Sequence, residues 1–176
     1  MAGQAWQRRR GPVSESLLVL ERRLAADPGS PADFELPLTA AERRVLRGRR
    51  STACGRPVLL QLPREGALRP GDQLSDGCGA VRVTVVAAPE PLLRVQADSA
   101  LALLQAAYHL GNRHVALELH PEEVRLLDDS VLAAMLEARG LVLSRCREPF
   151  APEGGAYGEA HHHSHSHSHS DSHSHP

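Results

Sequence analysis

The sequence predicts an α+β protein with a small N-terminal antiparallel β domain, then a ferredoxin-like βαββαβ domain and a disordered histidine-rich tail. Three observations support this prediction. Short aliphatic segments separated by turn residues fill the first half of the chain. Strand-like and helix-like patterns then alternate, and eight of the last sixteen residues are histidines.

Composition limits the possible functions. A chain of 176 residues can form one domain of average size or two small ones. The net charge of −1 gives no general reason to expect a nucleic acid or a membrane surface as partner. Three cysteines without a CxxC pair, Cys54, Cys78 and Cys146, fit a reducing compartment, so a cytoplasmic location is expected. No apolar run approaches the roughly 18 residues of a membrane span.

Residues 1–16 are predicted to form a disordered arm, because they have no apolar periodicity. Residues 17–88 are predicted to form the β domain. Its expected strands are residues 17–20, 45–53, 58–62 and 81–88, separated by turns rich in Gly, Pro and Asp. Nothing in this domain has the spacing of a catalytic site.

Pro89 and Pro91 mark the expected domain boundary, since two closely spaced prolines should prevent either flanking strand from running through them. The second domain is predicted over residues 91–150. Its expected elements are strand 92–97, helix 99–110, strand 114–120, strand 124–127, helix 130–139 and strand 141–147. This order predicts an antiparallel sheet with both helices on one face.

Capping residues support both helices. Asp98 is placed to cap the first helix and Gly111 to end it, while Asp128 or Asp129 precedes the second helix and Gly140 follows it. Apolar side chains expected to face the core are Leu101, Leu103, Leu104, Ala107, Tyr108 and Leu110 in the first helix, and Val131, Leu132, Met135 and Leu136 in the second.

His114, three residues after Gly111, is the expected first residue of the next strand. In this strand Val115, Leu117 and Leu119 should face the helices, which leaves His114, Ala116, Glu118 and His120 on the outer face. Its position just after a helix end makes His114 the main candidate metal ligand. His109 and His120 are secondary candidates, since an isolated histidine is more often a surface or structural residue.

The tail, residues 151–176, has almost no aliphatic residues and is predicted to be disordered without metal. Its histidines are His161, His162, His163, His165, His167, His169, His173 and His175. An expression tag is the simplest alternative, but the alternation with serine, Asp171 and the closing Pro176 indicates an encoded tail. Imidazole suits nickel, copper, zinc and cobalt, so composition alone does not name the metal.

Two other functional classes, an RNA-binding module and a metal hydrolase, fit poorly. An RNA-binding module stacks bases on aromatic residues of its strands, and the four strands predicted here contain none. A metal hydrolase needs a closed ligand set and a general base, such as HExxH, and no such spacing occurs.

Several segments together resemble the UreE family of urease accessory nickel metallochaperones. They are YHLGNRH at 108–114 with the aliphatic strand after it, the helix ending at Gly140-Leu141, Pro149-Phe150, Gly154-Gly155-Ala156-Tyr157 and the histidine tail. The resemblance covers the chain from about Leu17 to its end. It implies a protein that is not an enzyme, with nickel as its metal and possible binding of Zn²⁺, Cu²⁺ or Co²⁺ in vitro.

The resemblance also implies partners and a site. The family's β domain is similar to chaperone peptide-binding modules, which suggests partner docking, and its ferredoxin-like domains pair two chains. His114 corresponds to the family histidine that binds nickel together with its copy in the dimer. The implied partners are the urease accessory GTPase (UreG) and the urease apoprotein complex, with no nucleic acid or membrane. Additional histidines that some members carry before the second helix are replaced here by Asp128 and Ser130.

Symmetry offers a reason for a shared site. One imidazole holds Ni²⁺ weakly, and no other histidine of the folded part is at a chelating spacing from His114. A two-fold axis near this residue would bring two copies of it together, and tail histidines or water could complete the shell. The remaining alternative is passive storage or buffering of nickel or zinc, which needs the tail but no specific partner.

Overall fold

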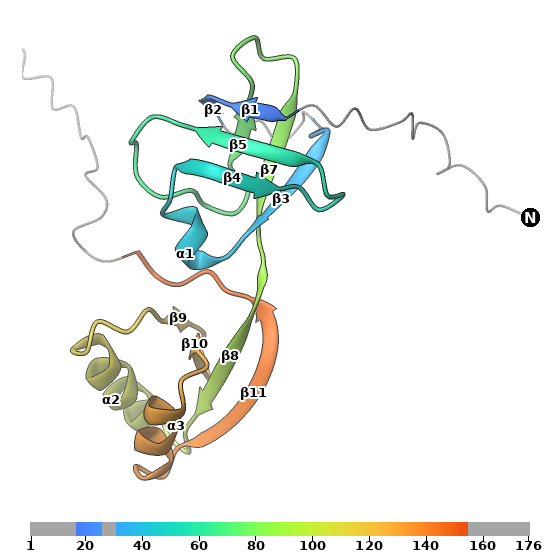
Figure 1. The fold of residues 1–176 in the computed structure, drawn as a ribbon. Helices are drawn as coiled ribbons and strands as arrows, with labels where there is room; N and C mark the ends of the chain where they lie inside the picture. The colour runs from blue at the N-terminus through green and yellow to red at the C-terminus, as the bar shows by residue number, and fades with distance from the viewer. Residues whose placement is uncertain (1–16, 26–30, 155–176) are drawn as a thin grey trace, which may run out of the picture.

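The computed structural model describes residues 17–25 and 31–154. It has the α+β class that the sequence predicts. An N-terminal half (residues 17–88) and a C-terminal half (residues 89–154) stack end to end (Figure 1). The predicted arm and the tail histidines lie outside the described residues.

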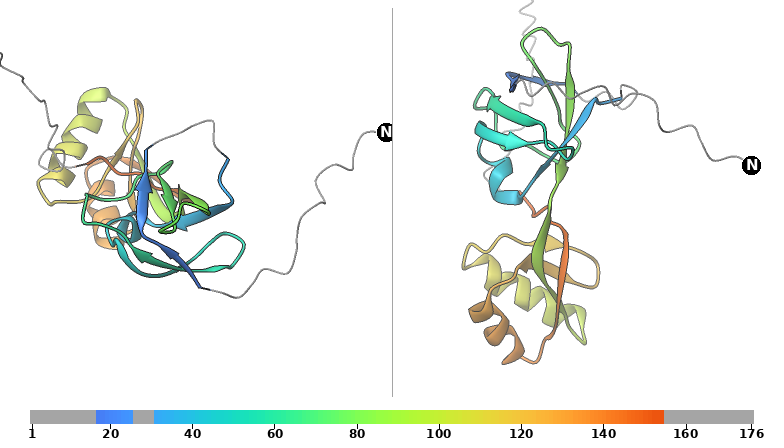
Figure 2. Two further views of the ribbon diagram at one scale, coloured as in Figure 1. Left: turned by 90° about the horizontal axis from the view of Figure 1, so that it is seen from above. Right: turned by 45° about the vertical axis from the view of Figure 1, so that its right-hand side comes forward.

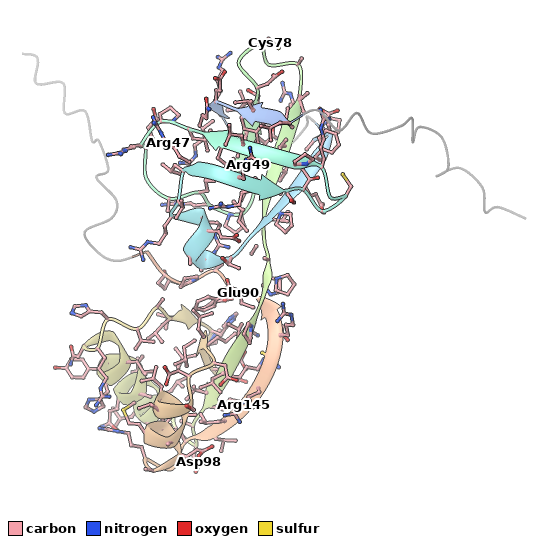
Figure 3. All side chains as sticks on the ribbon, viewed as in Figure 1. Arg47, Arg49, Cys78, Glu90, Asp98 and Arg145 are labelled. Carbon is pink, nitrogen blue, oxygen red and sulfur yellow. The ribbon has the colours of Figure 1, made fainter. Side chains whose placement is uncertain are left out.

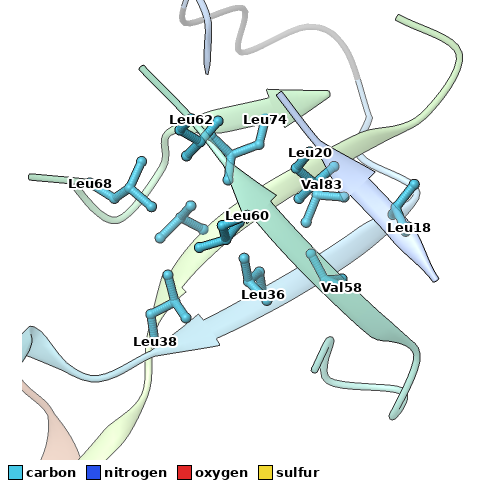
Figure 4. Close-up of a cluster of buried hydrophobic side chains, with 11 residues drawn as sticks. Leu18, Leu20, Leu36, Leu38, Val58, Leu60, Leu62, Leu68, Leu74 and Val83 are labelled. Carbon is cyan, nitrogen blue, oxygen red and sulfur yellow. The ribbon is translucent and has the colours of Figure 1, made fainter. Parts of the chain in front are cut away.

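The N-terminal half contains two small sheets. One has the order β1 (Leu18–Leu20), β5 (Pro57–Gln61), β4 (Arg47–Ser51). The other has the order β2 (Arg22–Leu24), β6 (Gln73–Ser75), β7 (Arg82–Ala87), β3 (Phe34–Leu38). A short helix, α1 (Ala40–Arg43), leads from β3 to β4. The inward side chains of both sheets form one aliphatic core that includes Leu20, Leu36, Leu60 and Val83 (Figure 4).

The predicted purely antiparallel arrangement of this half is wrong. β1 pairs with β5, and β3 with β7, in parallel. The predicted elements also do not include β2, β3, β6 and α1. β2 and β6 have three residues each, too few for a clear alternation. β3 was not predicted because it contains Pro37, which argues against a strand. β3 lies at the edge of its sheet, next to β7, and an edge strand tolerates a proline.

The C-terminal half is a four-stranded antiparallel sheet with the order β11-β8-β10-β9. Its elements are β8 (Pro89–Gln96), α2 (Ala100–Gly111), β9 (Glu118–Leu119), β10 (Val124–Leu127), α3 (Ser130–Glu137) and β11 (Val142–Pro149). Both helices pack on one face of the sheet, where Leu93, Val95, Leu110 and Leu136 share a core (Figure 2). Within the described ranges, no helix is long and apolar enough to cross a membrane.

The expectation that Pro89 and Pro91 interrupt the strands is wrong, because β8 begins at Pro89 and pairs with β11 through both prolines. The Pro91 carbonyl accepts a hydrogen bond from Asp128 N, on the side of the strand away from β11. The N and C=O of one strand residue point to the same side of the strand. The missing N–H of Pro91 would therefore point away from β11, so the pairing of β8 with β11 loses no hydrogen bond there.

Buried polar contacts join the two halves. Arg43 of α1 is 5% exposed and donates to the Leu38 carbonyl (2.9 Å) and to the Phe150 carbonyl (2.7 Å). Glu90 of β8 is 7% exposed and accepts a hydrogen bond from Ala40 N (2.7 Å). Burial lowers the pKa of Arg43, and the charge of Glu90 opposes that shift. The halves have separate aliphatic cores, but these contacts fix how they meet.

Candidate metal centre

The helix that carries His109 and leads to His114 is fixed at both ends. At its start the Ser99 side chain accepts a hydrogen bond from Ala102 N (3.2 Å), so Ser99, and not the predicted Asp98, is the N-cap of α2. Near its end Leu110 is fully buried in the core of the C-terminal half. The last turn of α2 therefore has a defined position on the sheet.

His114 lies in the turn that ends α2, and not at the start of a strand as predicted. His114 N donates to the Gly111 carbonyl (2.9 Å), and Val115 N donates to the Leu110 carbonyl (3.2 Å). This pair of bonds is a Schellman motif, and it places the left-handed residue at His114, whose φ is 58°. Gly111, predicted to hold that position, is a helical residue. The strand that follows is only β9.

The left-handed conformation of His114 is uncommon for a residue with a side chain and costs on the order of 1 kcal/mol. The side chain is exposed, so no packing contact requires an imidazole there. A strained, exposed histidine on a fixed turn is a typical candidate for a functional residue.

His109 lies on the last turn of α2 and is half-buried. Its ring makes an edge contact with Tyr108, with 5.6 Å between the ring centroids. The C-terminal end of a helix favours positive charge, so a cation is tolerated near both His109 and His114.

His120 follows β9 and is tied to a carboxylate. Its Nε2 lies 3.0 Å from Glu118 Oε1, and Glu118 Oε2 accepts a hydrogen bond from Ala151 N (3.0 Å). One imidazole nitrogen of His120 is therefore engaged within the chain. Leu119, expected to face the helices, is 52% exposed.

Carboxylates near His120 are engaged with arginines. Arg94 forms an ion pair with Glu148, and Arg125 lies between Glu148 (3.0 Å) and Glu123 (2.6 Å). The hydrogen bond from Arg94 holds the pKa of Glu148 below its usual range, and the nearby charge of Arg125 adds to this effect. These charged groups stabilise the outer face of the sheet by pairing with one another.

In the part of the chain that the structure describes, no three His, Cys, Asp or Glu side chains come together in an arrangement that could hold a metal ion. His109, His114 and His120 thus do not form a closed ligand set with one another or with the surrounding carboxylates. The eight tail histidines lie outside the described residues, so their placement is not part of this geometry.

An exposed apolar stripe runs along α2. Leu101, Leu104 and Tyr108 are 65%, 67% and 66% exposed and lie at i, i+3 and i+7, on one side of the helix. We call these three residues the α2 stripe. The prediction that these three residues face the core is wrong, and so is the same prediction for Val131 of α3, which is 72% exposed. The buried positions of α2 are Leu110, as predicted, and Ala106, which was not predicted.

Comparison with known proteins gives a consistent result. Residues 90–175 match the model of a family described as UreE urease accessory protein, C-terminal domain. The chain is 67% identical over 150 residues to the urease accessory protein UreE of Parasynechococcus marenigrum (strain WH8102), covering 85% of this chain and 99% of that protein. The identity to the protein of the same name from Thermosynechococcus vestitus is 51% over 124 residues, or 70% and 86% of the two chains. For Ectopseudomonas mendocina (strain ymp) it is 48% over 146 residues, or 82% and 86%.

Proposed function

The chain belongs to the UreE family of urease accessory proteins, and from this premise we propose that it carries Ni²⁺ as cargo and delivers it to the urease maturation complex. The family consists of accessory chaperones and not of enzymes. The proposed chemistry is therefore binding and release of the ion, with no bond made or broken in a substrate.

The observation that carries the proposal is the position of His114. This exposed imidazole is held in a left-handed turn by two backbone hydrogen bonds, at the end of a helix that is anchored in the core. A neutral imidazole is a suitable ligand for Ni²⁺. A ligand fixed by the backbone loses little conformational freedom when it binds.

The α2 stripe supports a homodimer. Three large apolar side chains exposed on one helix face are suited to packing against another copy of the same face. In such a two-fold arrangement each residue near the axis lies close to its own copy. The stripe ends less than two helical turns before His114, so pairing through it can bring the two His114 side chains to one ion.

The other parts of the chain are assigned roles that fit this site. The tail histidines, His161 to His175, collect metal, and His109 and His120 are auxiliary ligands. Zn²⁺, Cu²⁺ and Co²⁺ are expected to compete in vitro. An imidazole binds metal only when neutral, so uptake by the tail falls as the pH drops through about 6.5.

We assign residues 91–150 to a ferredoxin-like metal-binding and dimerisation domain and residues 151–176 to a metal-collecting tail. Residues 17–88 serve as a docking domain for a partner, with the urease accessory GTPase as the first candidate. The proposed location is the cytoplasm. No role with nucleic acid or membrane is proposed.

The nickel site is tested with the full chain, a chain ending at Ala160, and a His114→Asn variant. Asparagine tolerates the left-handed turn but removes the imidazole. Native mass spectrometry and calorimetric titration should give fewer ions per dimer after truncation, with one tight ion retained. His114→Asn should lose that ion but remain a dimer, whereas the control His109→Ala should keep it. A tight ion that survives His114→Asn would contradict the assignment.

Delivery and passive buffering differ in the response to a partner. If the protein delivers nickel, adding the urease accessory GTPase should accelerate nickel release from the loaded dimer, measured with a colorimetric chelator. Release that is equally fast with an unrelated GTPase would favour buffering.

A further inference from the structure

The outer face of the sheet β1-β5-β4 carries arginines beside aliphatic side chains. Arg49 of β4 lies opposite Leu59 of β5, and Leu59 lies beside Val19 of β1. Arg47 lies opposite Gln61 in the same sheet. Residues that lie opposite one another on neighbouring strands share a face. We call Arg47, Arg49, Leu59 and Val19 the arginine face.

This face is open. The intervening residues Val58 and Leu60 are fully buried, so the core lies on the opposite side of the sheet. Figure 3 shows Arg47 and Arg49 on the side facing the viewer, and in Figures 1 and 2 none of the described helices or strands covers it. Leu59 and Val19 are half-buried.

Within the described residues, the two arginines have no ion-pair partner. Arg47 and Arg49 are exposed, and neither side chain forms an ion pair or a hydrogen bond in the described part of the chain. Arg50 next to them differs, because its Nη1 donates to the Arg49 carbonyl (2.7 Å) and its Nε lies 3.7 Å from Glu42 Oε1. Residues 17–88 contain eleven arginines and eight Asp or Glu residues, so the excess of positive charge extends beyond this face.

An open hollow adjoins the arginine face. It is lined by Pro37, Glu42, Arg49, Arg50 and Ser51. Arg50 Nε is buried there without a hydrogen-bond partner, but Glu42 Oε1 lies 3.7 Å away and forms an ion pair with it. Arg49 is therefore the arginine of this hollow that has no ion-pair partner among the described residues. A carboxylate is the group that pairs best with such a guanidinium.

We propose that the arginine face docks an acidic, extended segment of a partner protein, whose carboxylates bind Arg47 and Arg49 while an aliphatic side chain packs on Leu59 and Val19. This inference rests on the proposed partner-docking role of the N-terminal half. A second copy of the same face would bring like charges together. RNA is disfavoured because the face offers no aromatic side chain for base stacking.

The test measures fluorescence anisotropy of labelled probes with the full-length chain. One synthetic peptide alternates glutamate with leucine, a second replaces each glutamate with lysine, and a third probe is an oligouridine. The acidic peptide should bind, and binding should weaken as salt is raised, since exposed ion pairs are screened. Equal binding of the lysine peptide, or preferential binding of oligouridine, would overturn the proposal.

Variants locate the binding. Arg47→Glu with Arg49→Glu should weaken binding of the acidic peptide by about tenfold or more. Leu59→Thr should also weaken it, because the aliphatic contact is lost without a change of charge. The matched control reverses Arg139 and Arg147, two exposed arginines of the C-terminal half that also lack an ion pair among the described residues. Circular dichroism checks that each variant is folded.

Two results would overturn the assignment of the face. One is an unchanged affinity in the folded Arg47→Glu, Arg49→Glu variant. The other is an equal loss in the Arg139, Arg147 control, which would indicate a general charge effect. Nickel stoichiometry of the same variants should match the unmodified dimer. The nickel measurement and the peptide measurement therefore test the two proposals separately: either proposal can be contradicted while the other holds.

Discussion

The two helices of the C-terminal half end in the same backbone pattern but place different residues in it. At the end of α3, Gly140 N donates to the Glu137 carbonyl (2.9 Å) and Leu141 N to the Leu136 carbonyl (3.2 Å). At the end of α2, His114 and Val115 make the corresponding bonds. The left-handed residue is Gly140 in α3, with φ 79°, and His114 in α2, with φ 58°.

The difference shows which end follows conformational preference. Glycine adopts the left-handed conformation without steric cost, so the end of α3 is what a helix stop ordinarily requires. In α2 the nearest glycine, Gly111, occupies a helical position, where glycine is disfavoured by about 1 kcal/mol relative to alanine. At the end of α2, glycine thus lies in the helix and a residue with a side chain lies in the left-handed position, the reverse of the usual preference. The result is an exposed imidazole in that turn.

The largest expected effect comes from His114→Gly. This change gives α2 the same left-handed residue as α3 and removes the imidazole. The tight nickel site should be lost, by more than the roughly 10- to 100-fold that follows loss of a supporting residue. The free energy of unfolding of the apoprotein should rise by up to about 1 kcal/mol, because glycine adopts the left-handed conformation without strain. Calorimetric nickel titration and urea unfolding measure the two effects.

Opposite directions of binding and stability are the informative result. A variant that loses nickel because it is poorly folded would lose both. If His114→Gly lowered the unfolding free energy by more than about 1 kcal/mol, the imidazole would make a stabilising contact and the comparison with α3 would fail.

Sequence reasoning located both helices but misplaced this turn. It assigned Gly111 to the left-handed position because glycine is the commonest residue there. The actual position depends on which carbonyls accept the last N–H groups, and here these are the carbonyls of Gly111 and Leu110. At α3 the same reasoning was correct, since the helix end and Gly140 coincide.

Burial was also only partly predictable. The apolar residues of α2 cover more than the side that faces the sheet, so periodicity could not separate Ala106 and Leu110 from the exposed α2 stripe. The α+β class and the element order of the C-terminal half could be predicted, because caps, periodicity and turn residues agree there. The buried contacts of Arg43 and Glu90 join distant parts of the chain and left no local pattern in the sequence.

A second prediction applies the α2 arrangement to α3. Gly140→His should lower the free energy of unfolding by about 1–2 kcal/mol, because a side chain is forced into the left-handed conformation. A Cβ added at Gly140 would meet no atom within 4 Å, so the cost is conformational and not a clash. No tight nickel site should appear. Among the described residues α3 has no exposed apolar stripe like that of α2, so nothing would bring the new histidine close to its copy in the other subunit. Urea unfolding and native mass spectrometry test both points.

The smallest effect is expected at Gly111, where the variant Gly111→Ala tests whether this glycine is needed within the chain. The residue is exposed and helical, and an added Cβ would meet no atom within 4 Å. Alanine should therefore raise the unfolding free energy by about 0.5–1 kcal/mol, with nickel stoichiometry unchanged. Gly111 also continues the spacing of the α2 stripe, three residues after Tyr108. If the alanine variant stabilises the fold but weakens the dimer in sedimentation measurements, the missing side chain serves close approach of the partner helix, and the reversal at the end of α2 would then have two causes instead of one.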